Sequence, residues 1–151
     1  MSRSLFLSLV VVLTSFPLFA QIAIGQWRDH LPYNSGVQVA DAGDWIYAAS
    51  QSGLFRYHKQ DGDIERLSKV TGLSDIGYSA IAWSEQNNTL IIAYTNTNID
   101  LIQDGSIINI PDIKDKSILG NKVINDIHLK GDYAYLACGF GIVVLDVVKH
   151  E

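Results

Sequence analysis

This 151-residue chain has a single cysteine, Cys138. A single cysteine excludes an internal disulfide framework and any zinc site built from several thiolates. Cys138 lies within an apolar run, where it is expected to pack as a small buried residue. The stability of the fold must therefore come from apolar burial and backbone pairing.

Positive charge is also in short supply. Eleven Lys and Arg residues face sixteen Asp and Glu residues, a net charge of −5, and the basic residues form no cluster. This balance argues against nucleic acid as a partner. The four histidines, at positions 30, 58, 128 and 150, lack the spacing of zinc ligands. The chain also lacks a phosphate-binding loop and a nucleophile–base motif, so the residues point to no metal and no cofactor. Paired catalytic carboxylates stay open as an alternative, although nothing in the sequence points to them.

The apolar run near the start of the chain is shorter than a membrane-spanning helix requires. It extends from Leu5 to Leu13, after Arg3 and before Pro17, with a small residue at Ala20. A spanning helix needs about 20 apolar residues, whereas a charged start, a short apolar stretch and a small residue at the cut are typical of a secretory signal. We therefore predict a signal peptide over residues 1–20 and export of the rest, in preference to a membrane anchor.

What the chain does contain is a repeated hairpin. The segment YAASQSGLFRY begins at Tyr47, and YLACGFGIVVL begins at Tyr135. Halfway between them, IIAYTNTNIDLI begins at Ile91, so that Ala49, Ala93 and Ala137 are spaced by 44 residues. Apolar residues alternate with period two, and Asp-Gly at residues 61–62 and 104–105 predicts further tight hairpins.

Short antiparallel strands repeating every 44 residues are typical of a β-propeller. We therefore predict an all-β fold, a partial propeller of about two and three-quarter four-stranded blades at residues 37–68, 78–110 and 123–151. A β-sandwich is the alternative, but it gives no reason for registered copies. Residues 21–36 form a lead-in segment that is a candidate ring-closing strand. Because propellers close with about four to eight blades, we expect the chain to be the first part of a longer protein, with an open edge at Leu145.

The repeat also predicts local correspondences. Val37 and Val39 should match Ile81 and Trp83 in the second unit, and Asn125 and Ile127 in the third. Asn98 should take the place of Gly53 and Gly141, since asparagine tolerates positive φ better than other non-glycine residues. The two glycines should either have positive φ or lie where no Cβ fits, and Gly141→Val should therefore be destabilising.

Two segments are candidates for partner contact. The lead-in segment GQWRDHLPY has no counterpart at the repeat spacing, and it contains Trp27, Arg28 and Tyr33, residue types enriched at interface centres. Its simpler interpretation is a lead-in strand. The loop KVTGLSD, with Thr71, Leu73 and Ser74, links the first two units, and loops between blades often carry binding. The loop at residues 116–123 is its counterpart.

Two stretches of the sequence resemble known families. TGLSDIGYSAIAWSEQNNTLIIAYTN, from Thr71, is similar to the two-component-regulator propeller repeat. AQIAIGQWRDHLPY followed by IYAASQSGLFRY resembles the start of PorZ-type proteins of the Bacteroidetes type IX secretion machinery. The second resemblance implies a non-catalytic cell-surface scaffold with two propellers and a C-terminal β-sandwich.

The same resemblance implies partners. PorZ-type proteins belong to the complex that attaches secreted cargo to anionic lipopolysaccharide beside a sortase-like transpeptidase, at the outer-membrane surface. The alternative is a periplasmic sensor propeller of a hybrid two-component receptor for glycans. A third interpretation, a propeller lyase or glycosidase, would require a cluster of acids, histidines or arginines at the central channel, which these repeats do not show.

Overall fold

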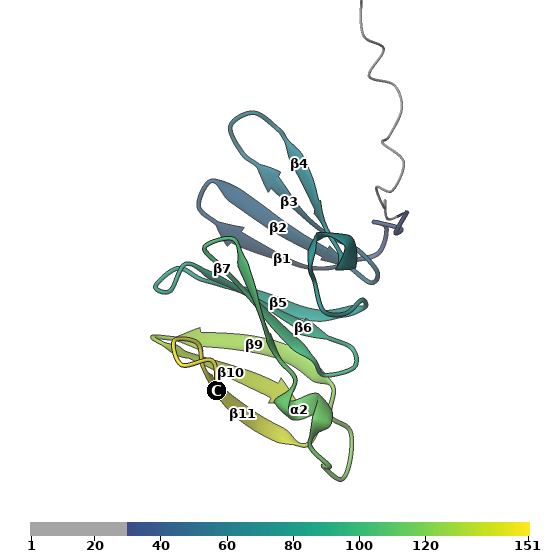
Figure 1. Cartoon of the computed structure of the whole chain (residues 1–151), viewed down its shortest axis with the longest axis vertical. Coiled ribbons are helices and arrows are strands. Elements are labelled where there is room, and N and C mark those ends of the chain that lie inside the picture. Colours follow the sequence, from purple (N-terminus) through teal and green to yellow (C-terminus); the bar gives the residue numbers. More distant parts are fainter. Residues whose placement is uncertain (1–29) are drawn as a thin grey trace, which may run out of the picture.

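The computed structural model describes residues 30–151, and the predicted signal peptide, Trp27 and Arg28 lie outside them. The described residues form three antiparallel sheets joined in chain order, as Figure 1 shows. Blade 1 contains β1 (Gly36–Ala42), β2 (Trp45–Ser50), β3 (Leu54–His58) and β4 (Ile64–Leu67). Blade 2 contains β5 (Tyr78–Ser84), β6 (Thr89–Tyr94), β7 (Ile99–Gln103) and β8 (Ser106–Ile110). Blade 3 contains β9 (Ile124–Lys130), β10 (Tyr133–Cys138) and β11 (Gly141–Asp146).

The three sheets meet through their first strands. β5 packs beside β1 on one side and β9 on the other. In Figure 1, β4 of blade 1 lies at the top of the view and β11 of blade 3 lies at the bottom. One side chain ties two of these inner strands together, because the backbone N–H of Ile81 donates to Oε1 of Gln38 at 2.9 Å. Inner strands that converge on one side are what a radial array of blades requires. The predicted all-β fold of partial propeller blades is confirmed.

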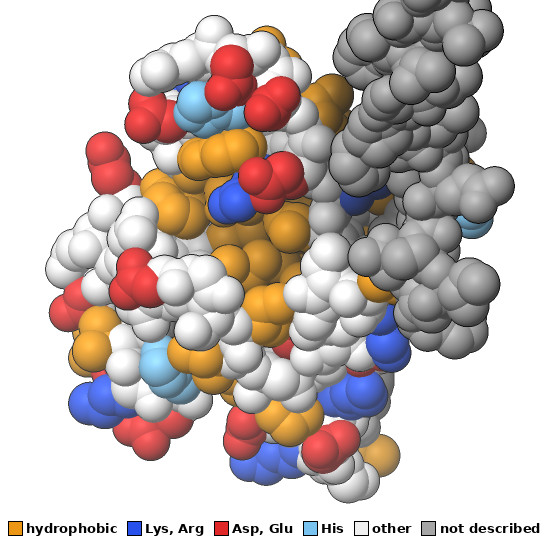
Figure 2. All heavy atoms as spheres, turned by 45° about the horizontal axis from the view of Figure 1, so that its top comes forward, with side chains coloured by type: hydrophobic (Ala, Val, Ile, Leu, Met, Phe, Trp, Pro, Cys, Tyr) orange, Lys and Arg blue, Asp and Glu red, His pale blue; other side chains and the backbone are white. Residues whose placement is uncertain are grey.

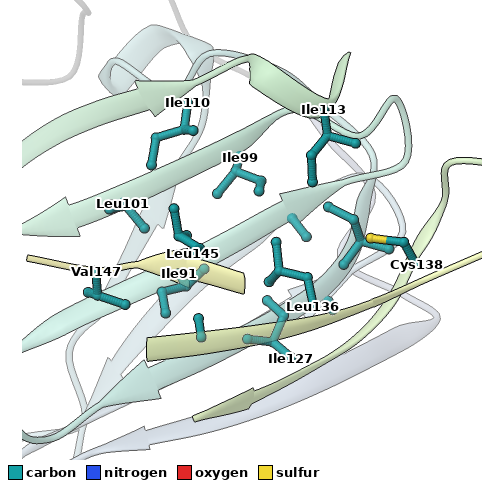
Figure 3. Close-up of a cluster of buried hydrophobic side chains, with 14 residues drawn as sticks. Ile91, Ile99, Leu101, Ile110, Ile113, Ile127, Leu136, Cys138, Leu145 and Val147 are labelled. Atoms are coloured by element: carbon teal, nitrogen blue, oxygen red, sulfur yellow. The ribbon is translucent and has the colours of Figure 1, made fainter. Parts of the chain in front are cut away.

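Two hydrophobic cores hold the blades together, one between each neighbouring pair. Ala49 lies in the core between blades 1 and 2, and Ala93 lies in the core between blades 2 and 3. Figure 3 shows the second core, where Ile91, Ile99 and Leu101 of blade 2 meet side chains of blade 3. The blade 3 residues labelled there include Ile127, Leu136, Cys138 and Leu145. Burying a side chain of this size stabilises a fold by about 1.5–3 kcal/mol.

Ala137 occupies the same strand position in blade 3, but it is exposed. It is paired with Ile142, which is 74% exposed, and Tyr135 of the same strand is paired with Val144, which is 50% exposed. These side chains form the face of blade 3 that corresponds to the covered faces of blades 1 and 2. Leu145, expected at the open edge, points instead into the core and is 3% exposed.

The register of blade 2 differs from the prediction by two residues. Ala49 pairs with Gln38 and Ala137 pairs with Asp126, but Ala93 pairs with Ala80. The turn between β5 and β6 contains four residues, 85–88, whereas the equivalent turns contain two, 43–44 and 131–132. Ile81 therefore corresponds to Val39, and the expected match of Val37 and Val39 with Ile81 and Trp83 is wrong.

In the turns between the second and third strands of the blades, the glycine predictions hold and the prediction for Asn98 does not. Gly141 has φ +146°, and a Cβ on Gly53 would meet the Tyr33 ring, so both glycine predictions are confirmed. In blade 2, however, the residue at positive φ is Thr97, at 69°, and not Asn98. Asn98 is buried and uses its side chain instead, donating to Oδ2 of Asp75 at 2.9 Å.

Candidate partner-contact surfaces

Tyr33 is the lead-in candidate that the structure describes, and it lies against blade 1. Its ring makes an edge contact with Phe55 at 5.8 Å between centroids, and the Arg66 guanidinium lies 5.3 Å from its centre. The hydroxyl of Ser50 also donates to the carbonyl of Pro32 at 3.2 Å. These contacts fix residues 32–33 on the face of blade 1 that points away from blade 2. Trp27 and Arg28 are not placed, so the structure does not bring the three candidates together.

The second candidate segment is shaped by a capping box. Residues Lys69–Thr71 form a 3-10 turn, η1, and Oγ of Ser68 accepts from the N–H of Val70 at 3.2 Å. The Thr71 hydroxyl accepts from the N–H of Ser68 at 2.8 Å, and Gly72 ends the turn at φ +111°. Thr71 is exposed, but its hydroxyl already serves the turn.

Leu73 and Ser74 have structural contacts as well. Leu73 is 3% exposed and packs in the core between blades 1 and 2, so its side chain holds the loop in place and does not face outward. The N–H of Ser74 donates to Oδ2 of Asp100 at 2.8 Å. The apolar side chains that this loop presents to solvent are Val70, 52% exposed, and Ile76, 54% exposed. Sequence reasoning missed both, although each lies within or beside the segment it selected.

A buried carboxylate anchors this loop to blade 2. Asp100 is fully buried and accepts hydrogen bonds from the Tyr94 hydroxyl at 2.6 Å, from Nδ2 of Asn109 at 2.8 Å and from Ser74. Burial first, and then the neighbouring Asp100 carboxylate, raise the pKa of Tyr94 above its ordinary value, so the phenol remains a donor. A single Asp inside the apolar segment IIAYTNTNIDLI was the one signal in the sequence for this network.

Asp75 connects the loop to the next inter-blade segment. Its Oδ2 accepts from Nζ of Lys114, in the short helix α2 (Asp112–Asp115), at 2.9 Å. Burial acts to raise the pKa of Asp75, but hydrogen bonds from Asn96, Lys114 and Asn98 outweigh it and lower the pKa to about 2. The carboxylate is therefore charged at neutral pH and holds this loop against α2.

In the counterpart loop at residues 116–123, the ammonium group of Lys122 bonds the loop to α2 and to its own first residue. Nζ of Lys122 donates to the carbonyls of Ile113, Lys114 and Lys116 at 2.7–3.1 Å. Leu119, in the same loop, is 98% exposed. Val70, Ile76 and Leu119 are the exposed apolar side chains of these two inter-blade segments, and we call these three side chains the loop-face triplet.

Two absences concern residues 30–151, the part of the chain that the structure describes. Within that range no His, Cys, Asp and Glu side chains gather in a group of three or more that could hold a metal ion. In the same part of the chain, no helix has the length and apolar character needed to cross a membrane.

Comparison with solved structures gives a similar protein at substantial identity. PorZ of the human oral bacterium Porphyromonas gingivalis, described as an essential bacterial surface component of the type IX secretion system, superposes with a TM-score of 0.79 at 33% identity. The match covers 83% of this chain and 17% of that protein, so the chain spans about a sixth of its length. No curated protein sequence matches the chain.

More distant structures share the fold alone. AztD of Citrobacter koseri superposes with a TM-score of 0.57 at 17% identity, covering 78% of this chain and 32% of AztD. The β-propeller domain of Cps50 (Swd1) from Myceliophteria thermophila gives 0.54 at 10% identity, covering 80% and 38%.

The family comparison agrees with the match to PorZ. The N-terminal β-propeller domain of PorZ, from the type IX secretion system, matches residues 46–151. That range includes most of blade 1 and all of blades 2 and 3. This chain therefore belongs to the family of PorZ N-terminal β-propeller domains of the type IX secretion system.

Proposed function

We propose that this chain is the N-terminal propeller region of a non-catalytic, surface-exposed scaffold that takes part in type IX secretion and in attaching cargo to the cell surface. The family match over residues 46–151 carries the proposal. The similar PorZ protein is itself a bacterial surface component of that system. Export directed by a signal peptide at residues 1–20, followed by association with partners, would place the chain at the outer-membrane surface.

The proposed partners are other secretion-system proteins, including a sortase-like transpeptidase, together with anionic lipopolysaccharide. The loop-face triplet supports a protein contact, because exposed apolar side chains on hydrogen-bonded loops are suited to a partner surface. Tyr33, Thr71 and Ser74, with Trp27 and Arg28 beyond the described residues, remain the contact residues proposed from the sequence.

Gene replacement in the source bacterium tests the function. Deletion of the gene should leave secreted cargo unattached to the surface, with unprocessed cargo accumulating inside the cell envelope, and the parent gene should restore attachment. Surface attachment is measured by protease accessibility of the cargo on intact cells. Normal attachment in the deletion strain would contradict the proposal.

The contact surface is tested separately in the restored strain. Ile76→Asp and Leu119→Asp place charge in the loop-face triplet without touching either core, so attachment and capture of the sortase-like protein should fall while the protein level is kept. Val148→Asp is a matched control, because Val148 is 56% exposed in the turn after β11, outside both loops and outside the Tyr33 contacts. Equal loss with the control variant would show that the triplet is not the contact surface.

A further inference from the structure

The two ends of the blades carry different charge. We call the end where first strands turn into second strands, and third strands turn back, the turn end; it comprises residues 41–45, 58–63, 85–88, 103–106, 130–133 and 146–151. These segments contain nine Asp and Glu residues against three Lys. At the other end, residues 68–77 and 111–123 contain three Asp against four Lys. The negative charge of the described residues is therefore concentrated on the turn end, opposite the loop-face triplet.

An apolar groove of about 200 Å³ opens at the turn end between blades 1 and 2. The half-buried apolar residues that line it are Ala42, Trp45, Trp83 and Ile102. Figure 2 shows orange side chains gathered in a hollow of the surface, with charged side chains at its border. The groove therefore offers a small apolar floor inside a charged border.

The aromatic rings of the groove are already engaged with one another and with cationic side chains. The Trp45 ring centre lies 4.2 Å from the Arg56 guanidinium and 4.6 Å from the His58 ring. Tyr47 is 5% exposed and is stacked on Trp83 at 6.0 Å between centroids. An aliphatic side chain needs only apolar contact and no open ring face, so it is the guest that this floor accepts.

The carboxylates beside the groove are not neutralised by other described residues. Asp104 lines the groove, while Asp44 and Glu85 lie in the turns that join its lining strands, and all three are exposed. Within residues 30–151 none of the three forms an ion pair. The cation in the groove is matched, because Nη2 of Arg56 lies 2.6 Å from Oε2 of Glu65. The border thus keeps excess negative charge.

We propose that this groove is a docking site for a basic segment of a partner protein, in which one aliphatic side chain enters the groove and flanking Lys or Arg side chains meet the acidic turns. Charge complementarity selects this occupant, since opposite charge steers a partner to the site and like charge repels it. The aliphatic side chain adds apolar burial, which fixes the position of the segment. The site lies at the end of the blades away from the loop-face triplet, and it does not depend on the role in secretion proposed above.

The test is a titration of the purified chain with three capped pentapeptides, followed by calorimetry and by tryptophan fluorescence. The peptides are Lys-Lys-Leu-Lys-Lys, the same peptide with glycine in place of leucine, and Glu-Glu-Leu-Glu-Glu. The basic leucine peptide should bind saturably with Kd of about 1 mM or below, the glycine peptide about tenfold more weakly, and the acidic peptide not at all. Binding of the leucine peptide should weaken as NaCl is raised, because salt screens exposed charges.

Two substitutions separate the groove from the charge around it. Ala42→Leu fills the groove from its own wall without changing the charge, so the leucine and glycine peptides should then bind alike. Asp104→Asn removes one border charge, and asparagine tolerates the φ of +48° at this position. This variant should bind the leucine peptide about threefold more weakly, with a smaller salt dependence. Asp115→Asn removes the same charge from an exposed position at the other end and should bind as the parent does.

Thermal melts establish that each variant is folded, and if Ala42→Leu does not fold, the comparison of Asp104→Asn with Asp115→Asn still decides. Three results would overturn the proposal. One is no saturable binding of the leucine peptide. Another is equal affinity of the parent chain for the leucine and glycine peptides, which would mean electrostatic association without a groove. The third is an equal effect of the substitutions at Asp104 and Asp115.

Discussion

The ring of Tyr33 lies so close to the backbone of Gly53 that a Cβ built on Gly53 would stand 2.6 Å from Cε1 of Tyr33. The lead-in segment therefore packs on the turn between β2 and β3, where only glycine leaves room for the Tyr33 ring. The glycine is required by a long-range contact and not by a left-handed backbone.

Gly53→Ala should therefore displace Tyr33 and lower the free energy of unfolding by about 1 kcal/mol. In a Tyr33→Ala background the same substitution should cost close to nothing, because the obstructing ring is gone. Urea denaturation of the four proteins measures this coupling. Equal costs in both backgrounds would show that the two residues do not constrain one another.

Gly141→Val tests the opposite situation, a glycine needed for its backbone. No atom lies within 4 Å of a Cβ at Gly141, but its φ of +146° is one that β-branched residues rarely adopt. The variant should lose more than about 1 kcal/mol of stability. Gly36→Ala is the control, because Gly36 lies in open space and has no positive φ. If the valine variant melts with its parent, the turn assigned between β10 and β11 is wrong.

Asp100→Ala should be the most destabilising of these substitutions. It leaves the Tyr94 hydroxyl and the Ser74 N–H without their shared acceptor, while the Asn109 amide keeps its bonds to Asn98 and Ile99. A buried polar group without a partner costs about 1–3 kcal/mol, so we expect a loss of about 3 kcal/mol or more. Asp63→Ala, at an exposed turn, should change stability by less than about 0.5 kcal/mol. A similar small loss at Asp100 would contradict the network.

The low pKa of Asp75 makes part of the stability depend on pH. The folded pKa is about 2 and the ordinary value is 3.8, so the stabilisation is fully present above the ordinary value and is lost as the pH falls through the folded value. Asp75→Asn should be less stable than the parent near pH 5, and the difference should shrink on acidification between about pH 4 and pH 2. Urea midpoints over that range measure it. A difference that stays constant with pH would mean that Asp75 gains nothing from its charge.

The sequence predicted the parts of this fold that are encoded locally. The Asp-Gly turn at residues 104–105 and the alternating strands around Ala49 and Ala137 were recognisable because hairpin turns and period-two patterns depend on neighbouring residues. The shifted register of blade 2 was not, since the repeat around Ala93 was aligned without allowing a longer turn. The contact of Ser74 with Asp100 joins residues 26 positions apart, and no local pattern marks such a pair.

For the candidate partner-contact residues, too, local features were predictable and long-range contacts were not. Thr71 and Ser74 were correctly placed in a loop between blades, but Leu73 is buried because the loop needs an apolar anchor, which only the packed structure reveals. Trp83 was read as a repeat position, and its stacking on Tyr47 depends on how blades 1 and 2 meet.

The four-residue turn at residues 85–88 limits which insertions and deletions such a blade can tolerate. Two additional residues keep the alternation of a strand in phase, so Ile81 still points to the same side as Val39 does in blade 1. Loss or gain of one residue there would rotate every following side chain of the hairpin to the opposite side and expose the core. Length variation among related propellers should therefore favour even steps at this type of turn.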